Sequence, residues 1–197
     1  MAWDTSFEGG REVVAFHESG ADPTLAVDLW MDTVYHREPL TTPGPIEVGF
    51  GSAGIYSVMV VLSPWESEGD ALFGVYPAQG QGDARITFDS DVETPDPVPH
   101  LGVVGVPITL TALAPLWLSD EDPYDIRIEP TGTRLESLGG EERELILLEP
   151  ASEPSLLRTI AAIPTEPLPP RSTWRVTFEF SLGGTMNQRT WSFATGP

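Results

Sequence analysis

The sequence predicts an α+β chain in which a helix and a β-hairpin precede an antiparallel β-sandwich. Two features of the 197 residues lead to this prediction. A single capped helical pattern lies near the N-terminus, and short segments of alternating apolar residues crowd the chain after residue 72. We therefore expect three parts: a first region over residues 1–62, a linker over 63–75 and a sandwich domain over 76–197.

A helix is expected from Asp22 to His36. The Asp22 side chain can accept a hydrogen bond from the first turn, and Pro23 suits the first helical position. Apolar and small residues then recur at helical spacing: Leu25, Ala26, Leu29, Trp30, Thr33 and Val34. Pro39 is expected to end the helix, because a proline disfavours helical backbone at the residue before it.

Two β-type segments follow the helix. The segments "IEVGFG" and "IYSVMVVL" flank the turn residues "GSAG", and we expect them to pair as a hairpin. Gly49 and Gly51 in the first segment indicate either a bulge or the close approach of another backbone.

Towards the C-terminus, strand signals alternate with proline- and glycine-rich turns. The expected strands are "LFGVYP", "ARITF", "VPITLTAL", "YDIRIEP", "ELILLEP", "LRTIAAIP", "TWRVTFEFSL" and "QRTWSFAT". The seventh alternates most clearly, because its apolar residues share one face: Trp174, Val176, Phe178 and Phe180. The spacing of these strands is typical of an antiparallel sandwich.

The charge of the chain excludes some classes of partner. All ten cationic residues are arginines, and 30 carboxylates bring the net charge to -20. Such a surface repels nucleic acid and anionic membranes. No apolar run approaches the ~20 residues of a membrane span, and the N-terminus as written lacks the basic and apolar regions of a signal peptide. Without cysteine, disulfides and thiolate metal sites are excluded.

Residues 10–62 contain an ordered set of motifs: Trp30-Met31, His36-Arg37, Gly49-Phe50-Gly51 and the strand from Tyr56 to Val61. This ordered set resembles the bacterial CAP superfamily, named for cysteine-rich secretory proteins, antigen 5 and pathogenesis-related proteins. The resemblance implies part of an αβα sandwich, here a helix plus a hairpin that matches the C-terminal part of the family's domain. It also implies a secreted protein, at the cell surface or outside the cell, if the natural chain has an upstream signal peptide.

The resemblance also implies a cleft lined by two histidines and two acidic residues. His36 matches one of these histidines, and Glu12 lies one position from one of the acidic residues. The other histidine belongs to a helical part of the family's domain that this sequence does not contain. Glu12 and His36 are therefore the candidate cleft residues and the candidate ligands for a divalent cation, zinc or calcium.

In the second half of the chain, the phrase "PLPPRSTW" precedes an expected strand, and "WSFAT" occupies the last one. With these phrases the second half resembles a bacterial Ig-like domain, of the kind that follows CAP regions in bacterial proteins. The residues support the same interpretation, since Trp174 and Trp191 supply large apolar side chains to a sandwich core.

Each candidate site has a plainer alternative. Zinc needs three or four ligands, and the sequence does not supply a full set near His36. The favoured interpretation of His36 is therefore a histidine at a helix C-terminus, where the dipole favours its charge. The acidic runs "DSDVETPD" at 89–96 and "SDEDPYD" at 119–125 lack the spacing of a calcium loop and are expected to be solvated. No Gly-x-Ser-x-Gly elbow is present for nucleophilic catalysis.

These observations favour a non-enzymatic module of a secreted bacterial CAP-domain protein, with the Ig-like half as a spacer or binding domain. Two alternatives stay open: a metal-assisted hydrolase that uses His36 and Glu12, and a purely structural surface spacer. The expected partner is an unidentified protein or small ligand, not nucleic acid, and no membrane span is expected. Self-association through the incomplete CAP region is a further option, because that region leaves apolar faces to be covered.

Overall fold

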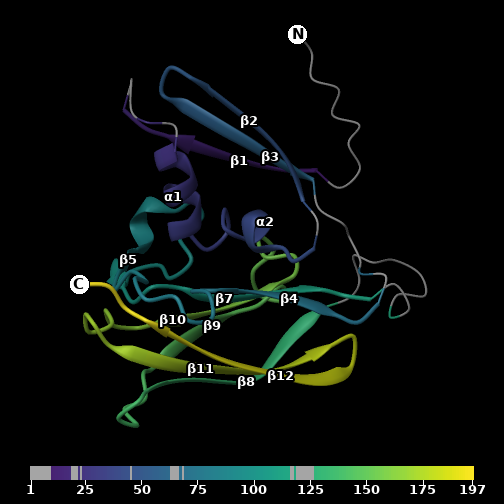
Figure 1. The fold of residues 1–197 in the computed structure, drawn as a ribbon, viewed down its shortest axis with the longest axis vertical. Coiled ribbons are helices and arrows are strands. Elements are labelled where there is room, and N and C mark those ends of the chain that lie inside the picture. Colours follow the sequence, from purple (N-terminus) through teal and green to yellow (C-terminus); the bar gives the residue numbers. More distant parts are fainter. Residues whose placement is uncertain are drawn as a thin grey trace.

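The chain folds into stacked layers that are mostly β-structure. The computed structural model describes residues 10–18, 22, 24–44, 46–62, 67, 69–115, 118 and 127–197. Of these residues, 48% lie in strands and 10% in helices. The described strands form four sheets, and the two short α-helices lie between the first sheet and the second (Figure 1).

The first layer, which we call the N-terminal layer, is a three-stranded antiparallel sheet with two helices on one face. The strands run in the order β1-β3-β2, and their bounds are β1 Gly10–Phe16, β2 Glu47–Ala53 and β3 Tyr56–Leu62. The helices are α1 Thr24–Asp32 and α2 Glu38–Thr41. The hairpin of β2 and β3 was expected, whereas β1 was not.

A small apolar cluster joins α1 to this sheet. Val13 and Ala15 on β1 pack with Ala26 and Trp30 on α1, and all four side chains are buried. Trp30 also meets the ring of Phe50 on β2 edge-to-face at 6.3 Å. Because residues alternate along a strand, one face of β1 takes part in this cluster and the other faces away from the helices.

The expected helix from Asp22 to His36 is interrupted. Helix α1 ends at Asp32, and the N–H groups of Val34 and Tyr35 donate to the Glu93 carboxylate instead of to helix carbonyls. A long-range contact, rather than Pro39, therefore ends the helix. Pro39 lies in the first turn of α2, where its missing N–H removes no helical hydrogen bond.

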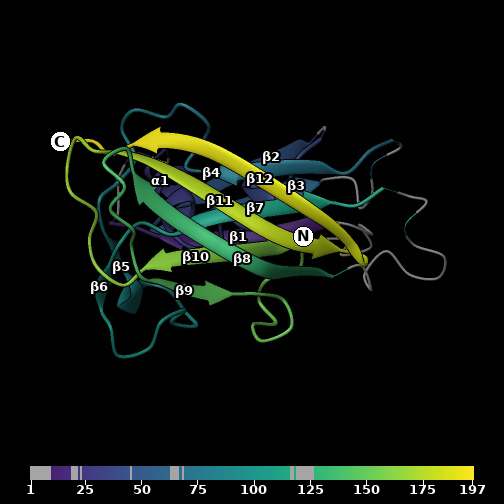
Figure 2. The same cartoon turned by 90° about the horizontal axis from the view of Figure 1, so that it is seen from below.

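The remaining strands build two packed antiparallel sheets and a small third one. One sheet has the order β4-β7-β10-β9, with bounds Leu72–Tyr76, Ile108–Leu113, Thr159–Pro164 and Leu145–Leu148. The other has the order β12-β11-β8, with bounds Thr185–Ala194, Thr173–Leu182 and Ile128–Ser137 (Figure 2). Strands β5 Phe88–Asp89 and β6 Val103–Val104 pair beside them, with the 3-10 turn η1 at Ser90–Val92.

The core between the two large sheets follows the expected alternation. On β11, Trp174, Val176, Phe178 and Phe180 are fully buried, and their neighbours Arg175 and Glu179 are exposed. Strand β10 does not alternate, since all six of its residues are buried. One of its faces packs in the sandwich core, and the other packs beneath the helices, as expected for a strand covered on both sides.

The fold class predicted from the sequence is wrong. A helix plus a hairpin from an αβα sandwich does not describe a chain with a third strand in the first sheet and only one helix longer than four residues among the described segments. The reason is that "REVVAF" pairs with β3, a strand 40 or more residues further along the chain, which local spacing cannot show. Strand β4 also begins inside the range predicted as a linker, 63–75. No helix in the described part of the chain is long and apolar enough to cross a membrane.

Candidate functional site

His36 lies on the turn that joins α1 to α2, where the N-terminal layer meets the loop after η1. Its Nδ1 is 3.2 Å from Oε1 of Glu93, and the His36 side chain is one-third exposed. The Glu93 side chain is fully buried. The histidine identified from the sequence therefore has an acidic partner, Glu93. This partner lies after η1, across the interface between the N-terminal layer and the rest of the molecule.

The Glu93 carboxylate binds backbone N–H groups of this turn. One carboxylate oxygen accepts the Val34 N–H and the other accepts the Tyr35 N–H, both at 2.7 Å. Two short hydrogen bonds from backbone amides to a buried carboxylate are of the charge-assisted, strong type. The carboxylate thereby replaces the helix carbonyls that the turn has lost.

Arg37 crosses from the same turn into the sandwich. It is fully buried, and its Nε donates to the Met31 carbonyl at 2.6 Å while Nη1 donates to the Pro107 carbonyl at 2.8 Å. Its guanidinium lies over the Tyr76 ring, 4.0 Å from the centroid. Burial lowers the pKa of Arg37 to about 10, although Tyr76 and Glu93 oppose the shift, so the side chain stays cationic at neutral pH. No described group accepts from its Nη2.

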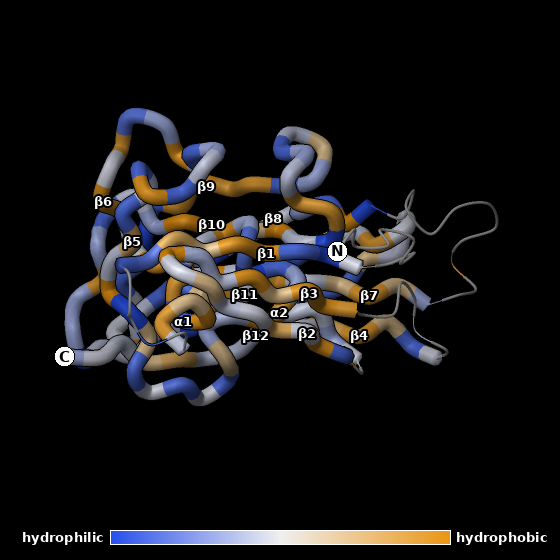
Figure 3. Tube along the Cα trace, turned by 90° about the horizontal axis from the view of Figure 1, so that it is seen from above, coloured by the Kyte–Doolittle hydropathy of each residue, from blue (hydrophilic) through white to orange (hydrophobic). Residues whose placement is uncertain are grey.

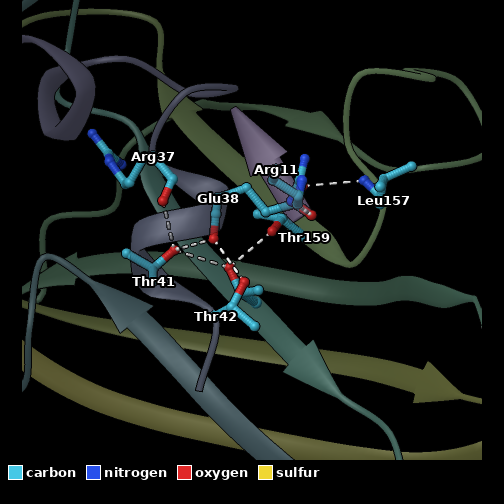
Figure 4. A network of polar contacts seen from close by, with 8 residues as sticks. Arg11, Arg37, Glu38, Thr41, Thr42, Leu157 and Thr159 are labelled. Carbon is cyan, nitrogen blue, oxygen red and sulfur yellow. Dashed lines mark hydrogen bonds and ion pairs between the residues drawn. The ribbon is translucent and has the colours of Figure 1, made fainter. Parts of the chain in front are cut away.

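Glu38 makes the third buried link between the layers (Figure 4). One of its oxygens pairs with Arg11 on β1 at 2.5 Å, and the other accepts the Leu157 N–H at 3.1 Å. Two threonines extend the network from α2 into the sandwich sheet: the Thr41 hydroxyl is 3.2 Å from that of Thr111, which contacts a further threonine on β10. Glu38 thus connects β1, α2 and the segment before β10.

The structure does not bring Glu12 to His36. Glu12 is exposed on β1, on the face opposite the buried residues Val13 and Ala15, whereas His36 is on the helix side of the sheet. Among the described residues, no group of three or more His, Asp or Glu side chains is placed to hold a metal ion. The pairing of Glu12 and His36 in one cleft is therefore not seen, because alternation along β1 turns Glu12 outward.

The other histidines and acidic runs have separate surroundings. His17 contacts the Ser57 hydroxyl at 2.8 Å, and Ser57 contacts Ser52 at 3.1 Å across the hairpin. Ser57 is fully buried, which suits a structural hydrogen bond better than a nucleophile. His100 is exposed in a loop. The acidic run at 119–125 lies outside the described residues, and that at 89–96 contains Glu93.

Sequence reasoning identified His36 but missed the residues that surround it. Glu93 was taken as part of a solvated acidic run, and Glu38 was not considered. No local signal distinguishes Glu93, since its neighbours Asp91 and Val92 are exposed. Glu38 had a weak local signal. It directly follows the His36-Arg37 motif and precedes Pro39 in the first turn of α2.

The burial of Tyr35 in this interface predicts how the stability of the protein depends on pH. Burial raises the pKa of the Tyr35 hydroxyl above its ordinary value of 10.0, and a neighbouring carboxylate, Glu153, adds to the rise. Above pH ~10 the unfolded chain therefore loses a proton that the folded chain keeps, and stability falls as pH rises, by up to ~1.4 kcal/mol per pH unit.

We expect Tyr35→Phe to remove this fall, as measured by urea unfolding of both proteins across the alkaline range. Arg37, whose lowered pKa has the opposite effect on stability in that range, is common to both proteins and cancels in the comparison. Parallel curves for the wild type and the variant would contradict the prediction.

Comparisons with known proteins do not identify a family for the chain. No model of a known protein family matches the chain, and no curated protein matches it.

Proposed function

We propose that the chain is a non-enzymatic module of a secreted bacterial CAP-type protein, in which the N-terminal layer and the sandwich act as one rigid unit. The observation that supports it most is the use of the His36–Glu38 segment. Its charged groups bind Glu93, Pro107 and Leu157 inside the molecule, where they hold layers together. The motif resemblance over residues 10–62 is the ground for naming that class of secreted protein.

A rigid unit of this kind suits a scaffold or binding role. Arg37 is fully buried and Glu38 nearly so, and neither is placed to meet a substrate. The Glu38 carboxylate and two of the three guanidinium nitrogens of Arg37 have partners, and such buried hydrogen bonds favour one arrangement of the layers. The sandwich contributes the larger core. Half of the large exposed apolar side chains among the described residues belong to the N-terminal layer, although it is the smaller part: Phe16, Leu25, Leu29, Ile46, Val48, Phe50, Ile55 and Tyr56.

Calorimetry and a hydrolysis assay together test this proposal. We expect the intact chain to unfold in a single transition, because the two parts share a buried polar interface. With Zn²⁺ added, model ester and peptide substrates should be turned over equally slowly by the wild type and by His36→Ala. Two well-separated transitions would contradict the rigid unit, and zinc-stimulated turnover lost in His36→Ala would favour a hydrolase.

A further inference from the structure

The sheet of the N-terminal layer has one face that no described helix or strand covers (Figure 1). Val13 and Ala15 pack on α1, so the residues between and beside them on β1 face the other way. The register of β1 and β2 with β3 then places their cross-strand partners on the same side. We call this side the outer face, and its residues are Glu12, Val14, Phe16, Glu47, Gly49, Gly51, Ala53, Tyr56, Val58, Val60 and Leu62.

The outer face is apolar over its middle and at one end. Phe16 is 67% exposed and Tyr56 is 48% exposed, and their rings meet edge-to-face at 5.0 Å. Val58 and Val60 on the central strand lie opposite Gly51 and Gly49. A Cβ added to either glycine would meet no atom within 4 Å, so there is open space beside the two valines. In Figure 3, which looks onto this layer, hydrophobic colour runs along β3.

Charges around the face have one sign. The first 84 residues contain two arginines, Arg11 and Arg37, and both are engaged inside the molecule. The exposed charged residues described in the N-terminal layer are all carboxylates. Glu12 and Glu47 lie on the outer face and Glu18 follows β1, whereas Asp22 and Asp28 lie on the α1 side of the sheet. A partner that covers the apolar residues therefore meets negative charge at the rim.

We propose that the outer face binds a cationic amphipathic helix of a partner protein. A helix with side chains is ~10–12 Å wide, which matches three strands spaced ~4.8 Å apart. Its apolar side would lie over Val58 and Val60, with the open space beside the glycines receiving its side chains. Lysine and arginine flanks would meet Glu12 and Glu47. A second copy of this chain would instead bring the same carboxylates together.

This inference rests on the proposed function and names the class of partner. The probe is a fluorescein-labelled Leu/Lys helical peptide of about 18 residues, ~27 Å long at 1.5 Å per residue. A Leu/Glu peptide with the same apolar side is the matched control for charge. Fluorescence anisotropy with the full chain at physiological salt measures both, and we expect the cationic peptide to bind at least about tenfold more tightly.

Three variants locate the binding. Gly51→Val places a branched side chain in the open space, at a position where an added Cβ meets no atom within 4 Å, and should weaken binding about tenfold. Gly82→Val, at a glycine outside this layer that also has no atom near its added Cβ, should leave binding unchanged. Replacing both Glu12 and Glu47 with Gln keeps the apolar residues and should weaken binding about fivefold. Thermal melts followed by circular dichroism check that each variant is folded.

Each result of these binding experiments either supports the proposal or overturns it. Binding that is weakened by Gly51→Val and by the double Gln variant supports the proposal. Absence of binding, equal binding of the Leu/Glu peptide, or binding unaffected by Gly51→Val overturns it. A dimer in sedimentation that Gly51→Val abolishes would assign the face to a second copy, which also overturns it. None of these results alters the unfolding or hydrolysis results that test the proposed function.

Discussion

Replacing Glu93 with Ala is expected to destabilise the protein by about 4 kcal/mol at neutral pH, as measured by urea unfolding. The substitution leaves the Val34 and Tyr35 N–H groups buried without an acceptor, and each such group costs about 1–3 kcal/mol. It also removes a carboxylate that favours the charge of the buried Arg37. The turn between α1 and α2 would lose its attachment to the sandwich side of the interface.

Two further variants make this prediction specific. Glu93→Gln keeps the shape and one acceptor oxygen, but its amide NH₂ would face the second backbone N–H, so we expect about half the loss. Glu12→Ala removes an exposed carboxylate and should change stability by less than about 0.5 kcal/mol. If Glu93→Ala cost less than about 1 kcal/mol, the carboxylate would not be what holds the turn.

Strands β10 and β11 of the sandwich were predictable because their side chains report burial directly, whereas β8 extends over Ile128–Ser137, mostly beyond the expected segment "YDIRIEP". Strand β11 alternates between large apolar and polar residues, and that period specifies both the strand and its buried face. Strand β10 could be predicted by its continuous apolar run bounded by a proline. Strand β1 was missed because its buried residues are only Val13 and Ala15, too few for a clear period.

Only the part of the site that lies in one short segment of the sequence was predictable. The sequence brought attention to His36 and Arg37, but their partners Glu93 and Pro107 lie more than 50 residues away. Nothing in an acidic run shows which carboxylate is buried, since that depends on a turn elsewhere in the chain. Glu12 failed as the partner for a related reason: its side of the sheet is set by the pairing of β1 with β3.

The sequence also does not reveal which strand glycines are approached closely by another backbone. A glycine inside a strand indicates a bulge or a close approach of another backbone, and Gly49 and Gly51 were interpreted in that way. The structure has open space at both positions. The close approach is instead at Gly74 on β4, where the Thr41 carbonyl at the end of α2 presses against the strand. The sequence alone does not distinguish these glycines, because their neighbours along the chain are similar.

Gly74→Ala is therefore expected to destabilise the protein by about 3 kcal/mol in urea unfolding. A Cβ at this position would lie 1.9 Å from the Thr41 carbonyl oxygen and 3.1 Å from its carbon. Both are backbone atoms, which cannot rotate away as the end of a side chain can, so α2 must move off β4. Overpacking of this kind usually costs about 1–3 kcal/mol, and the backbone contact places this case at the upper end.

Gly49→Ala is the matched control. It adds the same methyl group to β2 in the N-terminal layer, where the added Cβ meets no atom within 4 Å. It should be neutral or stabilising by up to about 1 kcal/mol, because alanine loses less backbone entropy than glycine on folding. A displaced α2 should also weaken the contact between the Thr41 and Thr111 hydroxyls, which amide hydrogen exchange on β7 would report as faster opening in Gly74→Ala. Equal stability of the two variants would show that α2 is not seated on β4, and the interface built from Arg37, Glu38 and Glu93 would lose its geometric basis.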